Sequence, residues 1–507
     1  MSSHHATGPD LPRSTPAEQG VDVTGIDAFV TALAPEPGAE LHSLMIVRHG
    51  HVVAEHWWPP YGPQTPHLLY SLSKSFTSTA LGFAVAEGTV DLDATVLSYF
   101  PELDARVTDE RSRRIRVRHV AAMSSGHEED TAGRAVKAGD GDMLLGFLLT
   151  PPEREPGTIF AYNQPCTYSI GAIIRRVSGV SLTEYLRTRL FEPLGLSTYG
   201  WITDSQGREQ GFSGLFMPTE AIAKLGQVYL SGGEWAGRRL LSAEWVAEAT
   251  SSHIATHEPG PDWDLGYGFQ FWQSRHGYRG DGAYGQFMLI LPEADAVVAI
   301  TSQSPDMQVV LDAVWAHLLP ALTAGDGPPG PWNPPTTPLA TPVAGGPASP
   351  TTSASVAGGG ADRGALSTSA SVAGGTAESG APTVPASGPT PPAVSAGLPT
   401  PATYVPGPDN ELTTLRRVQV GPRLVLTDDG PELVADLGAP GDWTITGPVA
   451  TAYAWSENLL LVDLVFVESP HRLHLTLDPA TGLFAARWAA PPLGEASLSE
   501  IRMPVDR

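Results

Sequence analysis

The sequence is poor in cysteine and lysine and has no long apolar run. Its single cysteine, Cys166, excludes an intrachain disulfide, so the chain carries no sign of an oxidising compartment. No stretch approaches the roughly 18 apolar residues of a membrane-spanning helix, and the first residues are polar, without the apolar core of a signal peptide. A cytoplasmic protein that does not enter membranes is therefore expected.

The chain also lacks any concentration of positive charge. Its 30 basic residues face 54 acidic ones, which gives a formal net charge of -24 and a pI near 4.9. Because no basic stripe is present, nucleic acid and anionic membrane surfaces are excluded as expected partners. His253 and His257 have the spacing of a zinc motif, but Ile254 stands where that motif has glutamate, so neither metal nor cofactor is expected.

The scarcity of lysine draws attention to Lys74. Only three lysines occur in the chain, and Lys74 lies three residues after Ser71 as the only charged side chain between Glu55 and Glu87. An arginine stays protonated, whereas a desolvated lysine can lose its proton and act as a base. If residues 70–87 form a helix, the two side chains are neighbours on one face, which is the Ser-x-x-Lys arrangement of acyl-transfer enzymes.

Composition divides the chain into three parts. Residues 325–408 are dominated by Pro, Gly, Ala, Ser and Thr, and the octapeptide at 352–359 recurs at 368–375. Such a segment has too little apolar bulk to fold, which predicts a disordered linker that leaves its neighbours free to move independently. The expected folded units are residues 1–324 and 409–507.

The periodicity of the first unit predicts an α+β domain. Strands are expected early and late in it, with helices across about 110–250, so that distant segments form one antiparallel sheet. The predicted elements are a hairpin of residues 43–48 and 51–58, later strands at 267–272, 286–291 and 296–302, and a closing helix at 307–318. In the last unit, Leu473, Leu475 and Leu477 alternate with polar residues, which predicts a small all-β barrel of unassigned role.

Three motifs in order resemble the serine hydrolases related to class C β-lactamases, a family that includes esterases, D-amino-acid peptidases and 6-aminohexanoate oligomer hydrolases. They are the run Ser71 to Lys74, the segment 156–164 containing Tyr162, and the segment 280–286. The resemblance covers about residues 12 to 322 and implies a β-lactamase/transpeptidase-like fold. It also implies that Ser71 is the acylated nucleophile, that Lys74 activates it, and that Tyr162 is the base and proton shuttle. The amides of Ser71 and Ala283, beside Gly282, would form the oxyanion hole.

Two departures from the family pattern bear on the substrate. Gln164, preceded by Asn163, stands where the second motif has asparagine, and Gly280 replaces the basic residue of the third motif. Since that basic residue normally meets a substrate carboxylate, a neutral small-molecule ester or amide is the predicted substrate, ahead of a β-lactam or D,D-peptide. Asp281 is expected either to bind a cationic group or to hydrogen-bond its own turn. A non-catalytic binding or sensing protein is the other functional class, and the sequence does not predict an oligomeric state.

Overall fold

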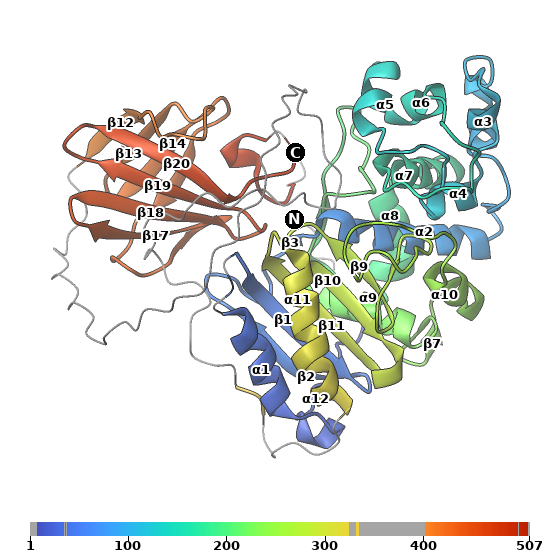
Figure 1. Ribbon diagram of the computed structural model, residues 1–507, viewed down its shortest axis with the longest axis horizontal. Helices are drawn as coiled ribbons and strands as arrows, with labels where there is room; N and C mark the ends of the chain where they lie inside the picture. Colours follow the sequence, from blue (N-terminus) through green and yellow to red (C-terminus); the bar gives the residue numbers. More distant parts are fainter. Residues whose placement is uncertain are drawn as a thin grey trace, which may run out of the picture.

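The computed structural model describes residues 8–34, 36, 38–323, 331–333, 401–494 and 496–504. Figure 1 shows an α+β body and, beside it, an all-β body. Most of the predicted linker, residues 325–408, lies outside the described residues. The α+β domain with a helical part and the C-terminal all-β domain are both confirmed.

A six-stranded antiparallel sheet organises the first domain. Its strand order is β2-β1-β11-β10-β9-β8. The strands are β1 (Glu40–Arg48), β2 (His51–Trp57), β8 (Trp272–Gln273), β9 (Tyr278–Gly282), β10 (Gln286–Leu291) and β11 (Ala296–Gln303). The predicted hairpin is confirmed: His49 and Gly50 make the turn with φ of 49° and 73°, the left-handed values that a tight hairpin turn requires.

Two strands differ from the prediction. The expected strand at 267–272 is wrong, because Tyr267 makes only isolated bridges and regular pairing is confined to β8. Strand β9 was not predicted, since its sequence Tyr-Arg-Gly-Asp-Gly combines glycine and charge, which are rare in strands. It forms because β10 and β8 pair with it on either side and because four of its five residues are buried.

Helices cover both faces of this sheet. Figure 1 shows α1 (Val23–Leu33), α11 (Met307–Ala313) and α12 (Leu319–Thr323) over one face, with a π-helical turn at Val314–Leu318 joining the last two. On the other face, α9 (Thr219–Leu230) packs along β1, β10 and β11. Gly226 permits this approach, because a Cβ there would lie 2.5 Å from Val297. No helix in the described ranges is long and apolar enough to cross a membrane.

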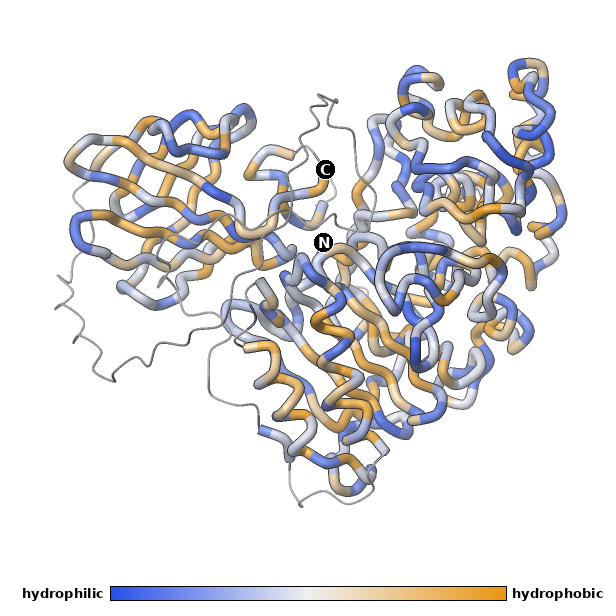
Figure 2. Tube along the Cα trace, in the orientation of Figure 1, coloured by the Kyte–Doolittle hydropathy of each residue, from blue (hydrophilic) through white to orange (hydrophobic). Residues whose placement is uncertain are grey.

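Some of the remaining helices pack against α2 (Ser73–Ala86), which is buried along nearly its whole length. It ends before Gly88, whose φ of 69° suits a helix C-terminus, as predicted. Figure 2 shows the apolar segments gathered in the sheet and the helices around it. The helices are α3 (Glu110–Arg113), α4 (Val117–Ala121), α5 (Ala132–Ala138), α6 (Met143–Leu149), α7 (Gln164–Ser178), α8 (Leu182–Leu186) and α10 (Ala243–Thr250), with short strands β3 (His67–Leu68), β4 (Gly200–Trp201), β5 (Leu215–Met217), β6 (Glu234–Trp235) and β7 (Arg238–Arg239).

The C-terminal domain is a nearly closed nine-stranded barrel. Its order is β15-β14-β13-β12-β20-β19-β18-β17-β16, and the backbone amide of Asp436 donates to Thr446 Oγ1 across the seam (2.9 Å). Leu473, Leu475 and Leu477 are buried in its core, as their alternation predicts. The strands are β12 (Ala402–Pro406), β13 (Arg417–Val420), β14 (Arg423–Thr427), β15 (Leu433–Asp436), β16 (Thr444–Thr446), β17 (Val449–Ser456), β18 (Leu459–Phe466), β19 (Arg472–Asp478) and β20 (Leu483–Ala490). Strand β12 lies inside the predicted linker, so the prediction of disorder is wrong for residues 402–406, and the barrel begins before the predicted boundary at 409.

The barrel packs against the first domain, so the expectation of two independently moving units is wrong for this structure. The amide of Leu68 in β3 donates to the carbonyl of Glu468 (2.8 Å), and the Arg472 guanidinium donates to Glu40 Oε1 (2.7 Å). Arg472 is only 8% exposed. A buried ion pair between domains requires a defined docking geometry, because either charge alone would be left desolvated.

Candidate active site

Ser71 and Lys74 meet where the polypeptide enters α2. Ser71 lies in a 3₁₀ turn (Tyr70–Leu72) and Lys74 in the first turn of the helix, and Lys74 Nζ is 3.0 Å from Ser71 Oγ. The helix is fixed by its own hydroxyls: Ser75 and Ser78 donate to the carbonyls of Gln270 and Phe269. The spacing read from the sequence therefore places the two side chains in direct contact.

Lys74 is buried, with 1% of its surface exposed, and has three oxygen neighbours. Besides Ser71 Oγ, Nζ donates to Gln164 Oε1 (2.8 Å) and to the carbonyl of Phe212 (2.8 Å). Burial lowers the pKa of the amine to about 7, while the carboxylates of Asp130 and Asp281 act in the opposite direction. A neutral amine can keep two N–H donors on Gln164 and Phe212 and turn its lone pair toward the Ser71 hydroxyl.

Tyr162 lies over the same amine. Lys74 Nζ is 4.6 Å from the centroid of the phenol ring, and the ring stacks on Trp272 with centroids 5.4 Å apart. Burial, and next the nearby carboxylate of Asp281, raise the pKa of Tyr162, although a hydrogen bond with Ser71 opposes them. The raised pKa does not favour the phenolate form that the expected role of Tyr162 as a base requires. The phenol is protonated at neutral pH and is therefore poised to donate a proton rather than to accept one.

The turn that carries Ala283 lies against the Ser71 turn. A Cβ on Gly282 would stand 2.0 Å from the carbonyl oxygen of Leu69, so only glycine permits this approach. Gln286 fixes the turn by donating from Nε2 to the carbonyls of Ala283 (3.0 Å) and Ser302 (2.7 Å). The structure therefore brings Ala283 and Gly282 beside the turn that carries Ser71.

Gln164 and Asn163 have different surroundings. Gln164 is the amide that contacts Lys74, whereas Asn163 is fully buried and its Oδ1 accepts from the amide (2.8 Å) and the hydroxyl (3.0 Å) of Thr131. Asn163 thus anchors the loop before α5 and does not reach Lys74. The longer side chain of Gln164 takes the position next to the lysine.

Asp281 meets neither expectation that the sequence raised for it. It lies in strand β9 rather than in a turn, and its Oδ2 accepts from Arg279 Nε (2.9 Å). Arg279 is fully buried and also donates to the carbonyls of Asp262 (2.8 Å) and Gln273 (3.0 Å). Because the carboxylate is already paired with a guanidinium, it is not a free site for a cationic group.

Gly280 is packed too tightly to have held a basic side chain. A Cβ at this position would lie 2.5 Å from Ser75 Oγ and 2.6 Å from Leu72 Cδ1, both buried. There is therefore no space beside the Gly280 Cα for water or for a substrate group. Substrate recognition must use other parts of the site.

Sequence reasoning missed two contributors to the lysine environment. Asp130 Oδ1 accepts from the amide of Gln164 (3.0 Å), which fixes the start of α7, and its charge raises the pKa of Lys74. The carbonyl of Phe212 belongs to a loop 138 residues from Lys74. A main-chain oxygen leaves no signature in sequence, so only the folded chain reveals it.

Cys166 is buried and burial raises the pKa of its thiol to about 12, as expected for a structural cysteine.

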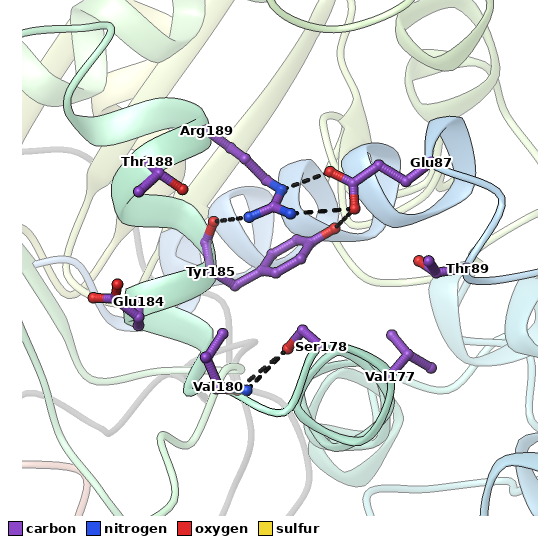
Figure 3. A pocket seen from close by; sticks show the side chains of 9 residues that line it. All are labelled: Glu87, Thr89, Val177, Ser178, Val180, Glu184, Tyr185, Thr188 and Arg189. Atoms are coloured by element: carbon purple, nitrogen blue, oxygen red, sulfur yellow. Dashed lines mark hydrogen bonds and ion pairs between the residues drawn. The ribbon is translucent and has the colours of Figure 1, made fainter.

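A surface hollow of about 410 Å³ lies at the far end of α2. Figure 3 shows Glu87 paired with Arg189 and Tyr185 inside it (2.6 and 2.9 Å). Glu87 follows Lys74 by 13 residues, which is roughly 20 Å along a helix. The hollow is therefore distinct from the Ser71 site.

In the described part of the chain no three His, Cys, Asp or Glu side chains gather as metal ligands.

An antiparallel sheet, a helical part and a serine three residues before a buried lysine define a hydrolase with the β-lactamase fold. The chain belongs to the Beta-lactamase family, whose model matches residues 26–322. It is 28% identical over 322 residues to the 6-aminohexanoate-dimer hydrolase of Paenarthrobacter ureafaciens, covering 58% of this chain and 81% of that protein.

Other relatives are more distant. A putative D-alanyl-D-alanine carboxypeptidase of Salmonella agona is 23% identical in an alignment of 278 residues that covers 41% of this chain and 64% of that protein. Among solved structures, a putative 6-aminohexanoate-dimer hydrolase from Bacillus anthracis superposes with a TM-score of 0.52 and 21% identity, covering 62% of this chain and 88% of the other. These matches confirm the predicted family and fold.

Proposed function

We propose that the protein is a serine hydrolase that cleaves small, neutral esters or amides through an acyl-enzyme on Ser71. The observation that carries the proposal is the contact between Ser71 Oγ and the buried Lys74 amine, whose pKa of about 7 leaves it substantially neutral at physiological pH. A neutral amine next to a hydroxyl is the base that serine needs to become a nucleophile.

In acylation, Lys74 takes the Ser71 proton as Oγ attacks the substrate carbonyl. The amides of Ser71 and Ala283 would hold the oxygen that becomes negative, a role typically worth about 100- to 1000-fold in rate per donor. The Lys74 ammonium then gives this proton to the leaving alcohol or amine, directly or by way of Tyr162, and becomes a neutral base again. Water then attacks the acyl group, gives its proton to the restored base, and releases the carboxylic acid and Ser71.

The substrate class follows from the missing basic residue. Gly280 offers no charge, and Arg279 is engaged by Asp281 and main-chain carbonyls. A substrate without a carboxylate loses nothing at such a site. The similarity to a 6-aminohexanoate-dimer hydrolase supports a small-molecule substrate, and the intact Ser71–Lys74 contact disfavours a purely binding protein.

A fluorophosphonate probe tests the nucleophile. Mass spectrometry should find the probe on Ser71 alone among the 38 serines, and Ser71→Ala should abolish labelling and hydrolysis of p-nitrophenyl butyrate. Lys74→Arg should be nearly as damaging as Lys74→Ala, because guanidinium does not release its proton. Labelling that persists in Ser71→Ala would refute the proposal.

The chain offers a matched control for the lysine. Lys224 is also buried, at 2% exposure, and is held by Asp10 (3.1 Å) and the carbonyl of Leu194 (2.9 Å). Lys224→Arg keeps the charge of an ion-paired lysine and should retain most hydrolytic activity. Equal losses in the two arginine variants would mean that burial of any lysine, rather than its basicity beside Ser71, is what matters.

A further inference from the structure

The two residues that flank the expected oxyanion-hole amides are tyrosines in an unusual backbone conformation. Tyr70 precedes Ser71 with φ of 48°, and Tyr284 follows Ala283 with φ of 66°. Bulky residues rarely adopt the left-handed region, and they remain there only when surrounding structure holds them. Contacts with the surrounding structure must therefore hold these two tyrosines in place.

The barrel domain supplies the contacts for both tyrosines. The hydroxyl of Tyr70 is 2.7 Å from His471 Nε2, and the amide of Leu493 donates to the same hydroxyl (3.4 Å). The hydroxyl of Tyr284 donates to the carbonyl of Pro491 (2.5 Å). All three partners lie more than 180 residues beyond the tyrosines in the chain.

The direction of the Tyr70 hydrogen bond is fixed by the other side of the histidine ring. His471 Nδ1 lies 2.9 Å from the carbonyl of Ala490, an atom that can only accept. Nδ1 must therefore carry the proton, and the lone pair on Nε2 accepts from the Tyr70 hydroxyl. Burial lowers the pKa of His471 to about 4, which is consistent with a neutral ring.

The same groups form one apolar cluster across the domain boundary. Tyr70, Tyr284 and Ala283 are buried together with Ala490, and the rings of Tyr70 and Tyr284 each meet His471 nearly edge-on at 5.8 Å. The cluster excludes water from the outer side of the two turns. A turn held by buried contacts in this way has one main-chain orientation rather than a range of orientations.

We propose that the barrel domain completes the hydrolytic site, with His471 as a positioning residue that acts through Tyr70 on the amide of Ser71, and with Pro491 acting through Tyr284 on the amide of Ala283. The proposal rests on the proposed function of Ser71. Without these contacts the two amides would lose their alignment toward the oxyanion. Because alignment matters most in the transition state, the loss should appear in kcat rather than in KM.

Three substitutions in the full-length protein test this relay. His471→Leu removes the acceptor, Tyr70→Phe removes only the hydroxyl, and His471→Gln retains a side-chain oxygen able to accept from Tyr70. With p-nitrophenyl butyrate, the first two should lower kcat by about 10- to 100-fold, less than the loss of a whole oxyanion donor, with KM changed by less than about threefold. His471→Gln should recover most of the rate.

A tetrahedral inhibitor provides a second readout. A small alkyl boronic acid forms an adduct with an active serine whose oxygen occupies the oxyanion hole, so its affinity should fall in parallel with kcat in His471→Leu and Tyr70→Phe. Tyr453→Phe is the control, because it removes a hydroxyl from the barrel core without touching the first domain, and it should leave both quantities unchanged.

The outcomes separate the two proposals. If fluorophosphonate fails to label Ser71 in the unmodified protein, the proposed function fails. If Ser71 is labelled but Tyr70→Phe and folded His471→Leu keep kcat and boronate affinity within about twofold, only the positioning role is overturned. A loss confined to KM would also overturn it, since the barrel would then shape substrate binding instead. Should His471→Leu not fold, the Tyr70→Phe result decides.

Discussion

The pKa of Lys74 predicts the pH dependence of hydrolysis. Burial lowers this pKa from 10.5 to about 7, and the base must be neutral to accept the Ser71 proton. The neutral fraction is then roughly one tenth at pH 6, one half at pH 7 and nine tenths at pH 8. We therefore expect kcat/KM to rise about tenfold from pH 6 to pH 8 and to change little from pH 8 to pH 9.

Removing a nearby negative charge tests whether Lys74 is the group that sets the midpoint of the pH profile. Asp130 is the first of the two carboxylates that raise the pKa of Lys74, so Asp130→Asn should move the midpoint to lower pH. Its amide oxygen can still accept from the amide of Gln164, which preserves the start of α7. Asp22→Asn is the matched control: Asp22 accepts from Thr24 at the start of α1, remote from the site, and should leave the midpoint unchanged.

The assay is the initial rate of p-nitrophenyl butyrate hydrolysis at constant ionic strength, with the rate of Ser71→Ala subtracted at each pH to remove spontaneous hydrolysis. An amine with an ordinary pKa would make kcat/KM climb tenfold per pH unit through pH 9. Such a continued rise, or a midpoint indifferent to Asp130→Asn, would show that Lys74 is not the base.

Other predictions follow from the same geometry. Between pH 7 and 10.5 Lys74 binds fewer protons in the native state than in the unfolded chain, so its contribution to the free energy of unfolding rises with pH in that window. In urea titrations, the free energy of unfolding of the unmodified protein should therefore rise by about 2 to 3 kcal/mol relative to that of Lys74→Met between pH 7 and pH 9. Equal pH dependence in both proteins would contradict the burial of a titrating amine. The missing charge at Gly280 should make kcat/KM for p-nitrophenyl acetate exceed that for nitrocefin, since a charge-assisted hydrogen bond is worth about 1.5 to 3 kcal/mol. Gly280→Lys should lower the melting temperature without improving nitrocefin turnover, because its Cβ would meet Ser75 and Leu72.

Local pattern was sufficient to predict the contacts and the strands that depend on residues close together in the chain. The spacing of Ser71 and Lys74 fixes their contact once α2 forms, and the apolar periodicity of residues 286–291 and 296–302 predicts β10 and β11 to within one residue. In both cases the decisive neighbours are within one helical turn or one strand. Such short-range order is what sequence periodicity encodes.

Features set by distant segments were not predictable. The Phe212 carbonyl beside Lys74 is a main-chain group, and the raised pKa of Tyr162 depends on burial beneath Trp272, neither of which leaves a residue pattern. His471 lies 400 residues after Ser71 and has no motif around it. Its place beside the site is decided by how the barrel docks, which tertiary packing alone determines.

The docking of the barrel leads to a last prediction, on cleavage of the chain. The sequence predicts a disordered linker over residues 325–408, of which 402–406 form strand β12, so a protease should cut in the part before β12 and leave two fragments. The contacts of His471 with Tyr70 and of Arg472 with Glu40 do not depend on chain continuity. The fragments should therefore co-elute in gel filtration with esterase activity retained, and activity should fall when mild urea separates them. If the separated catalytic fragment, still folded by circular dichroism, hydrolysed p-nitrophenyl butyrate at the full rate, the barrel would be dispensable for the chemistry at Ser71.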